Sequence, residues 1–86
     1  MGSRIRFILN KIKWHGGLNL EDYEVHILHR GAPSNVKIIT GSEITGIFKD
    51  AFTYRNPKGI EEVIPYHRVL LIRDKIRNVI LFSKRS

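Results

Sequence analysis

The sequence predicts an α+β protein with one N-terminal helix packed on a five- to six-stranded, mainly antiparallel, strongly curved sheet. Apolar residues recur at helical spacing only near the N-terminus, and short apolar runs separated by Gly, Pro and Asn follow from position 23 onwards. We expect the 86 residues to form a single domain. That domain, residues 1–86, would comprise a helix over 4–14, a β-rich region over 23–83 and a basic tail at 84–86.

The helix is predicted from one apolar stripe. Its members recur at i, i+3, i+4 and i+7, and they are Ile5, Ile8, Leu9 and Ile12. The pair Gly16-Gly17 is predicted to end the helix, because glycine disfavours helix and tolerates positive φ. The stripe should therefore face the sheet.

A second face of this helix carries aromatic and polar side chains. Helical geometry places Phe7 and Trp14 together, with Asn10 and Lys11 beside them. On a nucleic-acid-binding protein such a face would form a stacking platform. The alternative is that the rings pack against another part of the chain, which is our prediction for Phe7 and stays open for Trp14.

Six segments have the composition of strands, at positions 23–30, 36–40, 51–55, 60–64, 69–73 and 79–83. Turn residues at 31–35 predict a hairpin between the first two strands, and Asn56-Pro57-Lys58-Gly59 predicts a turn between the next two. For residues 42–47 we expect either one short helical turn or an irregular crossing. The late strands are apolar on both faces, so we expect them to curl towards a small barrel.

The charge of the chain points to a polyanion as partner. Fifteen Lys and Arg residues against eight Asp and Glu residues give a net charge of +7 and a pI near 10.2. Nucleic acid is the first candidate, through release of counterions from its phosphates, and charge kept only for solubility is the alternative. No apolar run has the length of a membrane span or of a signal peptide, so we expect a cytoplasmic protein with no membrane partner.

Metal and cofactor chemistry find little support in the sequence. There are no cysteines, which excludes disulfides and thiolate sites. His26 and His29 are three residues apart on a predicted strand and would point to opposite faces. We therefore predict no metal site and no cofactor.

The stretch Ile64-Pro65-Tyr66-His67-Arg68 contains the first candidate site. Pro65 fixes its own φ and keeps Ile64 extended, so the next three residues gather where a strand begins. A ring, an imidazole and a guanidinium together suit a phosphate or a nucleotide end. The alternative is a Pro-bounded strand start with three half-exposed polar residues.

The second candidate is His29-Arg30-Gly31. Arg30 can bond phosphate oxygens with its planar fork, and the backbone can approach a ligand closely at Gly31. If the strand that starts at Val69 lies beside this one, His29 and His67 could converge. Such a cluster would bind phosphate, or act as acid and base in phosphodiester cleavage. The sequence supplies no distinct nucleophile, so we assign no catalytic residue, and binding without catalysis is the favoured reading.

Several motifs together resemble a known family. They are Leu9-Asn10-Lys11-Ile12-x-Trp14, Asp22-Tyr23-Glu24, Leu28-His29-Arg30-Gly31-Ala32-Pro33, Ser42-Glu43-Ile44 and Ile64-Pro65-Tyr66-His67-Arg68-Val69. The chain resembles a family of small archaeal proteins of uncharacterised function, similar to the RNA cyclic-group end recognition domain that is fused to RNA-processing proteins in eukaryotes. The resemblance covers roughly Arg4 to Phe82. It departs at His15-Gly16-Gly17-Leu18, where relatives are expected to carry an acidic and basic stretch.

The resemblance implies an RNA-binding domain that recognises a phosphorylated or 2′,3′-cyclic-phosphate RNA terminus in RNA processing or repair, with RNA-processing enzymes as partners. The residues that it carries over for RNA or phosphate binding are Asn10, Lys11, Trp14, His29, Arg30, Tyr66, His67 and Arg68. Either Trp14 or Tyr66 would stack on the terminal base. Two alternatives stay open from the residues themselves: a small phosphodiesterase that uses the two histidines, and a protein-interaction module that docks a partner at an exposed sheet edge. The oligomeric state is not predicted.

Overall fold

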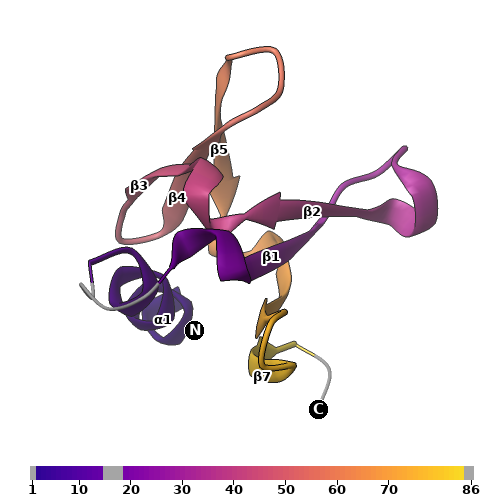
Figure 1. Ribbon diagram of the computed structural model, residues 1–86. Helices are drawn as coiled ribbons and strands as arrows, with labels where there is room; N and C mark the ends of the chain where they lie inside the picture. The colour runs from indigo at the N-terminus through magenta and orange to yellow at the C-terminus, as the bar shows by residue number, and fades with distance from the viewer. Residues whose placement is uncertain (1, 15–18, 85–86) are drawn as a thin grey trace.

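The computed structural model describes residues 2–14 and 19–84. Within these residues it has one α-helix and seven strands arranged in two antiparallel sheets, which confirms the α+β class (Figure 1). Helix α1 covers Gly2–Trp14. The strands are β1 (Tyr23–Leu28), β2 (Val36–Thr40), β3 (Ile44–Ile47), β4 (Ala51–Arg55), β5 (Glu61–Pro65), β6 (Val69–Asp74) and β7 (Val79–Ser83). Four short 3₁₀ turns connect them: η1 (Leu20–Asp22), η2 (Pro33–Asn35), η3 (Gly41–Glu43) and η4 (Tyr66–Arg68).

Helix α1 buries the predicted stripe. Ile5, Leu9 and Ile12 are part of the core, and Ile8 packs at its margin. The Nζ atom of Lys13 donates to the carbonyl oxygen of Ile44 at 2.9 Å, which ties the last turn of α1 to β3. The predicted stop at Gly16-Gly17 lies outside the described residues. No helix in residues 2–14 and 19–84 is long and apolar enough to cross a membrane.

The four-stranded sheet has the order β2-β1-β6-β7. The hairpin of β1 and β2 forms as predicted, with Val25 opposite Ile39. Strand β1 ends at Leu28, two residues earlier than predicted, because the backbone then enters a turn closed by the bond from the His29 N–H to the Asn35 carbonyl at 2.8 Å. Gly31 adopts a φ of 94° in this turn, a conformation that L side chains disfavour.

The three-stranded sheet has the order β3-β4-β5 and includes a strand that we did not predict. Strand β3 pairs with β4, with Ile44 opposite Tyr54 and a shift in register before Gly46. Ile44 and Ile47 are three residues apart, which is a helical spacing, and Gly46 has a low strand propensity. The prediction of a helical turn or an irregular crossing over 42–47 is therefore wrong for Ile44–Ile47, which form β3. Only η3 (Gly41–Glu43), a 3₁₀ turn, is helical.

The predicted single, strongly curved sheet of five to six strands is also wrong in detail. Two open sheets share one core instead, in which Phe52 and Ile64 of the smaller sheet belong to the same cluster as Val25 and Ile72 of the larger. The second apolar face of the late strands is partly exposed, as at Val63 and Ile80. Apolar residues on both faces of a strand therefore did not require closure into a barrel.

A bulge in β7 determines which side chains face the helix. Ile72 pairs with Phe82 and Arg73 pairs with Ile80, so Leu81 is the additional residue in β7. Leu81 and Phe82 are both partly buried against the core, although consecutive strand residues ordinarily face opposite ways. The bulge thus presents two neighbouring apolar side chains to one side of the sheet.

Candidate nucleic-acid interface

The Pro-Tyr-His-Arg motif forms the turn η4 between β5 and β6. Pro65 is the last residue of β5, with φ −62° and ψ 145°, and the N–H of Val69 closes the turn on the Tyr66 carbonyl. The motif was predicted at the start of a strand, and it lies immediately before β6. The turn places the side chains of His67 and Arg68 at the surface, exposed and half-buried respectively.

Tyr66 is a core residue. It is 3% exposed, its ring lies 6.3 Å from that of Phe52 in a stacked arrangement, and its hydroxyl donates to the Phe48 carbonyl. Burial raises the pKa of Tyr66. Stacking of Tyr66 on a terminal base does not fit this burial, which leaves Trp14 as the exposed ring of the two sequence candidates.

Arg68 joins the two predicted motifs. Its Nε and Nη2 atoms donate to the carbonyl oxygen of Leu28 at 3.0 and 2.7 Å. Leu28 is the last residue of β1 and precedes His29, and β1 pairs with β6 through Ile27 and Val69. The guanidinium therefore lies where the His-Arg-Gly and Pro-Tyr-His-Arg motifs adjoin.

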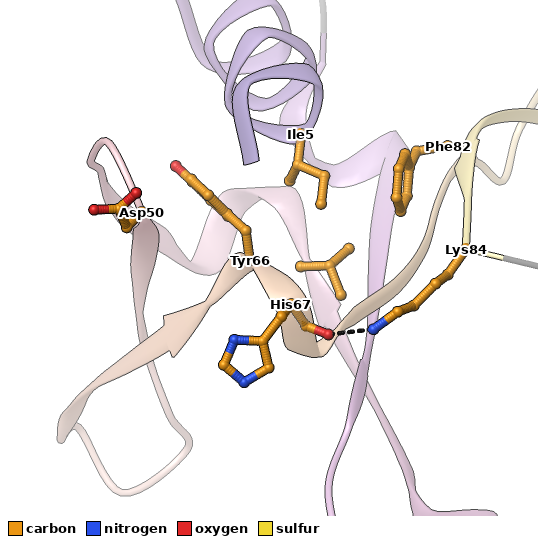
Figure 2. Close-up of a pocket in the computed structure, with 7 residues that line it drawn as sticks. Ile5, Asp50, Tyr66, His67, Phe82 and Lys84 are labelled. Carbon is orange, nitrogen blue, oxygen red and sulfur yellow. Dashed lines mark hydrogen bonds between the residues drawn. The ribbon is translucent and has the colours of Figure 1, made fainter. Parts of the chain in front are cut away.

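The two histidines have different surroundings. His29 is half-buried and lies near Glu62. The pKa of Glu62 is lowered mainly by a hydrogen bond from Asn56 at 2.6 Å, and less by the charges of Lys37 and His29. Figure 2 shows the His67 imidazole pointing away from α1. The Arg68–Leu28 contact brings the two motifs together, and convergence of the two imidazoles on one ligand stays a prediction.

Arg30 follows His29 in the turn after β1, and its side chain is exposed. It lies two residues after Leu28, whose carbonyl Arg68 contacts. The remaining candidates, Asn10, Lys11 and Trp14, all lie on α1. The sequence-predicted residues thus form two groups, one at η4 and the end of β1 and the other on the helix.

A pocket of about 310 Å³ lies between α1, η4 and β7 (Figure 2). Its lining residues are Ile5, Asp50, Tyr66, His67, Val69, Phe82 and Lys84. The Nζ atom of Lys84 donates to the His67 carbonyl, and the guanidinium carbon of Arg4 lies 5.9 Å from the centroid of the Phe82 ring. The pocket therefore combines an apolar lining with cations from both ends of the described chain.

The outer face of α1 is open to solvent. Phe7 and Trp14 are 69% and 72% exposed, and together with Asn10 and Lys11 they line a shallow hollow of about 350 Å³. The prediction that Phe7 packs against another part of the chain is wrong. Trp14, whose position was left open, is an exposed ring with the Lys13 ammonium 5.6 Å from its centroid.

A third hollow, of about 300 Å³, connects these two places. It is lined by Phe7, Ile8, Lys11, Ile12, Tyr23 and Leu81. Phe7 and Lys11 also line the hollow on the helix, and Leu81 is the neighbour of Phe82 in the pocket. The pocket and the third hollow therefore lie where α1 meets β7, and the second hollow lies on the outer face of α1 beside the third.

Sequence reasoning missed Phe82 and Lys84. The sequence pattern indicated only that Phe82 belongs to a strand, because it does not reveal the bulge that turns this ring towards the pocket. Lys84 was assigned to a basic tail, whereas its backbone N–H donates to the Leu70 carbonyl at 2.9 Å and continues the pairing past β7. The only available signal was the position of a cation directly after an apolar strand, which is too common to single out a site.

The described part of the chain contains no group of three His, Cys, Asp or Glu residues that could hold a metal ion. His26 instead lies 3.3 Å from the Glu24 carboxylate, which also accepts from the Nε atom of Arg73 at 3.1 Å.

Comparison with known proteins agrees with the motifs. A family model described as the MJ1316 RNA cyclic group end recognition domain matches residues 3–84. UPF0248 protein MJ1316 from Methanocaldococcus jannaschii is 41% identical over 83 residues, which cover 94% of each chain. UPF0248 protein MmarC6_0667 from Methanococcus maripaludis is 36% identical, over 94% of this chain and 99% of the relative.

A more distant relative, UPF0248 protein M1425_2629 from Saccharolobus islandicus, is 30% identical over 81 residues. No solved structure matches the chain. Because the family model spans nearly the whole sequence, and these relatives match it over most of their length, the chain belongs to the MJ1316 RNA cyclic group end recognition domain family.

Proposed function

We propose that the chain binds RNA and holds a phosphorylated terminus, a 3′-phosphate or a 2′,3′-cyclic phosphate, where η4 meets the end of β1. The observation that carries this proposal is the contact of the Arg68 guanidinium with the Leu28 carbonyl, which joins the two cationic motifs at one place. The family's description as an RNA cyclic group end recognition domain supports it. So does the net charge of +7.

In this proposal the cations of both motifs surround the phosphate. Arg30, His67 and Arg68 donate charge-assisted hydrogen bonds to its oxygens, and His29 completes the set. A 3′-phosphate has one more non-bridging oxygen than an internal phosphodiester, and a 2′,3′-cyclic phosphate holds its phosphorus in a five-membered ring with no nucleotide beyond it. These donors can therefore distinguish an end from the middle of a strand by its geometry. Lys84, bonded to the carbonyl of His67, adds a cation at the same turn.

The outer face of α1 supplies a second contact. Trp14 stacks on a base near the terminus, while Asn10 and Lys11 contact the backbone beside it. The high exposure of Trp14 supports this role, because the ring is available without any rearrangement. We further propose that such end binding serves RNA processing or repair in the cytoplasm, with RNA-processing enzymes as partners.

A binding titration tests the proposal directly. One short RNA is prepared with a 2′,3′-cyclic phosphate, a 3′-phosphate and a 3′-hydroxyl, and each form is titrated at two salt concentrations. We expect a phosphorylated end to bind more tightly than the hydroxyl end, and the preference to survive the higher salt. Arg68→Lys keeps the charge but loses the planar fork, so it should reduce the preference by about tenfold. Lys58→Ala, in the exposed turn between β4 and β5, is the matched control.

Two results would contradict the proposal. Equal affinity for the three ends, lost at higher salt, would mean that the net charge alone drives binding. Cleavage of the RNA, with a rate that depends on pH through two apparent pKa values, would instead favour a phosphodiesterase that uses His29 and His67.

A further inference from the structure

The pocket between α1, η4 and β7 has the lining of a site for a flat apolar group. Ile5, Val69 and Phe82 supply aliphatic and aromatic surface, and the pocket's volume of about 310 Å³ lies at the lower end of the range for small-ligand sites. Figure 2 shows the Phe82 ring with its face turned towards Ile5 and the middle of the pocket. A half-buried ring presented in this way is a stacking surface for a base.

Charge is distributed unevenly along the pocket. Lys84 lies at one end, beside the His67 carbonyl, and Asp50 lies at the other end, beyond Tyr66 (Figure 2). A phosphate is attracted to the Lys84 end and repelled from the Asp50 end. Any nucleotide in the pocket is therefore oriented with its phosphate towards Lys84 and the His67 carbonyl.

We propose that this pocket receives the unpaired terminal base of the RNA, stacked on Phe82, and that the strand continues along α1 to Trp14. The inference rests on the proposed function, because a terminal phosphate held at η4 is what brings the last base to the pocket. It adds a base site, a strand path and a requirement for a single-stranded end. Trp14 then stacks on a base further from the terminus.

The bulge in β7 places two consecutive side chains in neighbouring hollows. It directs Phe82 into the pocket and Leu81 into the adjoining hollow, which Phe7 and Lys11 share with the hollow beneath Trp14. From Ile5 to Trp14 the helix rises about 13.5 Å, and the path also passes from the buried face of α1 to its exposed face. Stacked nucleotides advance about 3.4 Å each, so the path accommodates roughly four nucleotides or more. Lys11 lines both the hollow beside Leu81 and the hollow beneath Trp14, so its ammonium can contact the RNA backbone there.

A paired terminus does not fit this arrangement. Seating the last base on Phe82 requires that it leave its partner, and unpairing costs a few kcal/mol. A blunt duplex with the same terminal phosphate should therefore bind more weakly than a strand with a few unpaired nucleotides at that end.

Removal of individual bases tests the pocket. Three versions of one RNA are made, and each ends in a 2′,3′-cyclic phosphate. The first has all its bases, the second lacks the base of the terminal nucleotide, and the third lacks a base near the opposite end. For the unsubstituted protein, loss of the terminal base should weaken binding by roughly 5- to 150-fold, the range measured for one stacked base. Loss of the distant base should change it little.

Two variants relate that penalty to the ring. Phe82→Leu keeps an apolar side chain in the core margin but removes the stacking face, and thermal unfolding checks that it folds. It should bind the intact RNA more weakly and show almost no further penalty for the abasic terminus, because the two changes remove the same contact. Ile80→Ala, on the same strand but 60% exposed, should keep the full penalty.

An equal penalty in the unsubstituted protein and in Phe82→Leu would overturn the pocket assignment, and so would the absence of any penalty at the terminus. These results do not depend on the end-group preference, since every RNA in this experiment carries the same phosphate. The proposed function fails separately, when the cyclic, phosphorylated and hydroxyl ends bind equally.

Discussion

Arg68 directs two nitrogen atoms to one backbone carbonyl, that of Leu28. An arginine has five N–H donors in a rigid fork, so this contact fixes the plane of the guanidinium and leaves its other edge to face elsewhere. The same side chain therefore positions the end of β1 and presents charge at the proposed phosphate site. Arg68→Lys is a sharper test than removal of the side chain for this reason.

Asp74 is a buried carboxylate whose partners make stability depend on pH. It accepts from the backbone N–H of Arg77 and of Ile76 and from the Arg77 guanidinium, and these bonds lower its pKa below the usual 3.8. A lowered pKa contributes stability that is present above pH 3.8 and is lost as the pH falls through the folded-state value.

We predict that Asp74→Asn lowers the free energy of unfolding at neutral pH, because the neutral amide loses the ion pair with Arg77. Urea unfolding at a series of pH values measures the difference from the unsubstituted protein. The difference should shrink as the pH falls below 3.8, because the carboxylate of the unfolded wild type is protonated first and that of the folded protein follows at its lower pKa. A difference that stays constant down to pH 2 would contradict this role.

The sequence predicts which segments adjoin at the candidate site, but not which individual side chains are buried or exposed there. The order and composition of the motifs identified η4 and the end of β1, but not that Tyr66 would be core and Phe7 exposed. An aromatic residue has the same apolar signature on either side of a helix or turn. Its burial is decided by whether another element packs over it, which only the tertiary arrangement determines.

Among the elements, a polar contact near the C-terminal end of α1 ties the helix to the smaller sheet. The Lys13 ammonium reaches the Ile44 carbonyl of β3 and also lies over the Trp14 ring. This contact orients the face on which Trp14 lies. It places the helix with respect to β3, the strand that sequence patterns did not reveal.

Lys13→Met should lower the free energy of unfolding by about 1 kcal/mol, since it removes a charged hydrogen-bond donor from a half-buried carbonyl. Guanidinium chloride unfolding measures the change. Lys11→Met, two residues earlier on the exposed face, provides the comparison and should leave stability within about 0.5 kcal/mol. Equal effects of the two substitutions would show that the bond to β3 contributes nothing.

The strands differ in how well local sequence determines them. Strands β1, β2 and β4 have apolar residues at every second position and clear turns after them, so their existence was predictable. Strand β3 is short and contains Gly46, which is half-buried beside Thr53 and Phe48, and its pairing depends on β4. The arrangement of seven strands in two sheets follows from such long-range pairing and not from any local pattern.

For the whole molecule, charge determines the salt dependence of binding. A net charge of +7 attracts any nucleic acid, and each phosphate neutralised contributes about 0.7 to the slope of log affinity against log salt for a single strand. The proposed path along α1 assigns one such contact to Lys11.

Lys11→Ala should therefore reduce that slope by about 0.7 and weaken binding to all three RNA ends alike. Titrations at four or more salt concentrations give the slope, with Lys58→Ala as the control. A slope that is unchanged in Lys11→Ala would place the RNA backbone away from the helix.

The pairing of β1 with β6 joins segments that are far apart in the sequence, so it can form only late in synthesis. Val25 pairs with Ile72, so β1, one of the two central strands of the larger sheet, acquires its second neighbour only after most of the chain has been synthesised. Closing so long a loop is slow compared with forming the local β1–β2 and β4–β5 hairpins. During translation those hairpins can therefore appear early, whereas η4 and its contact with β1 are completed among the last steps. A nascent chain that stops short of β6 would have its hairpins but not the β1–β6 pairing that sets η4 beside the end of β1, so the proposed phosphate site would be among the last parts of the molecule to form.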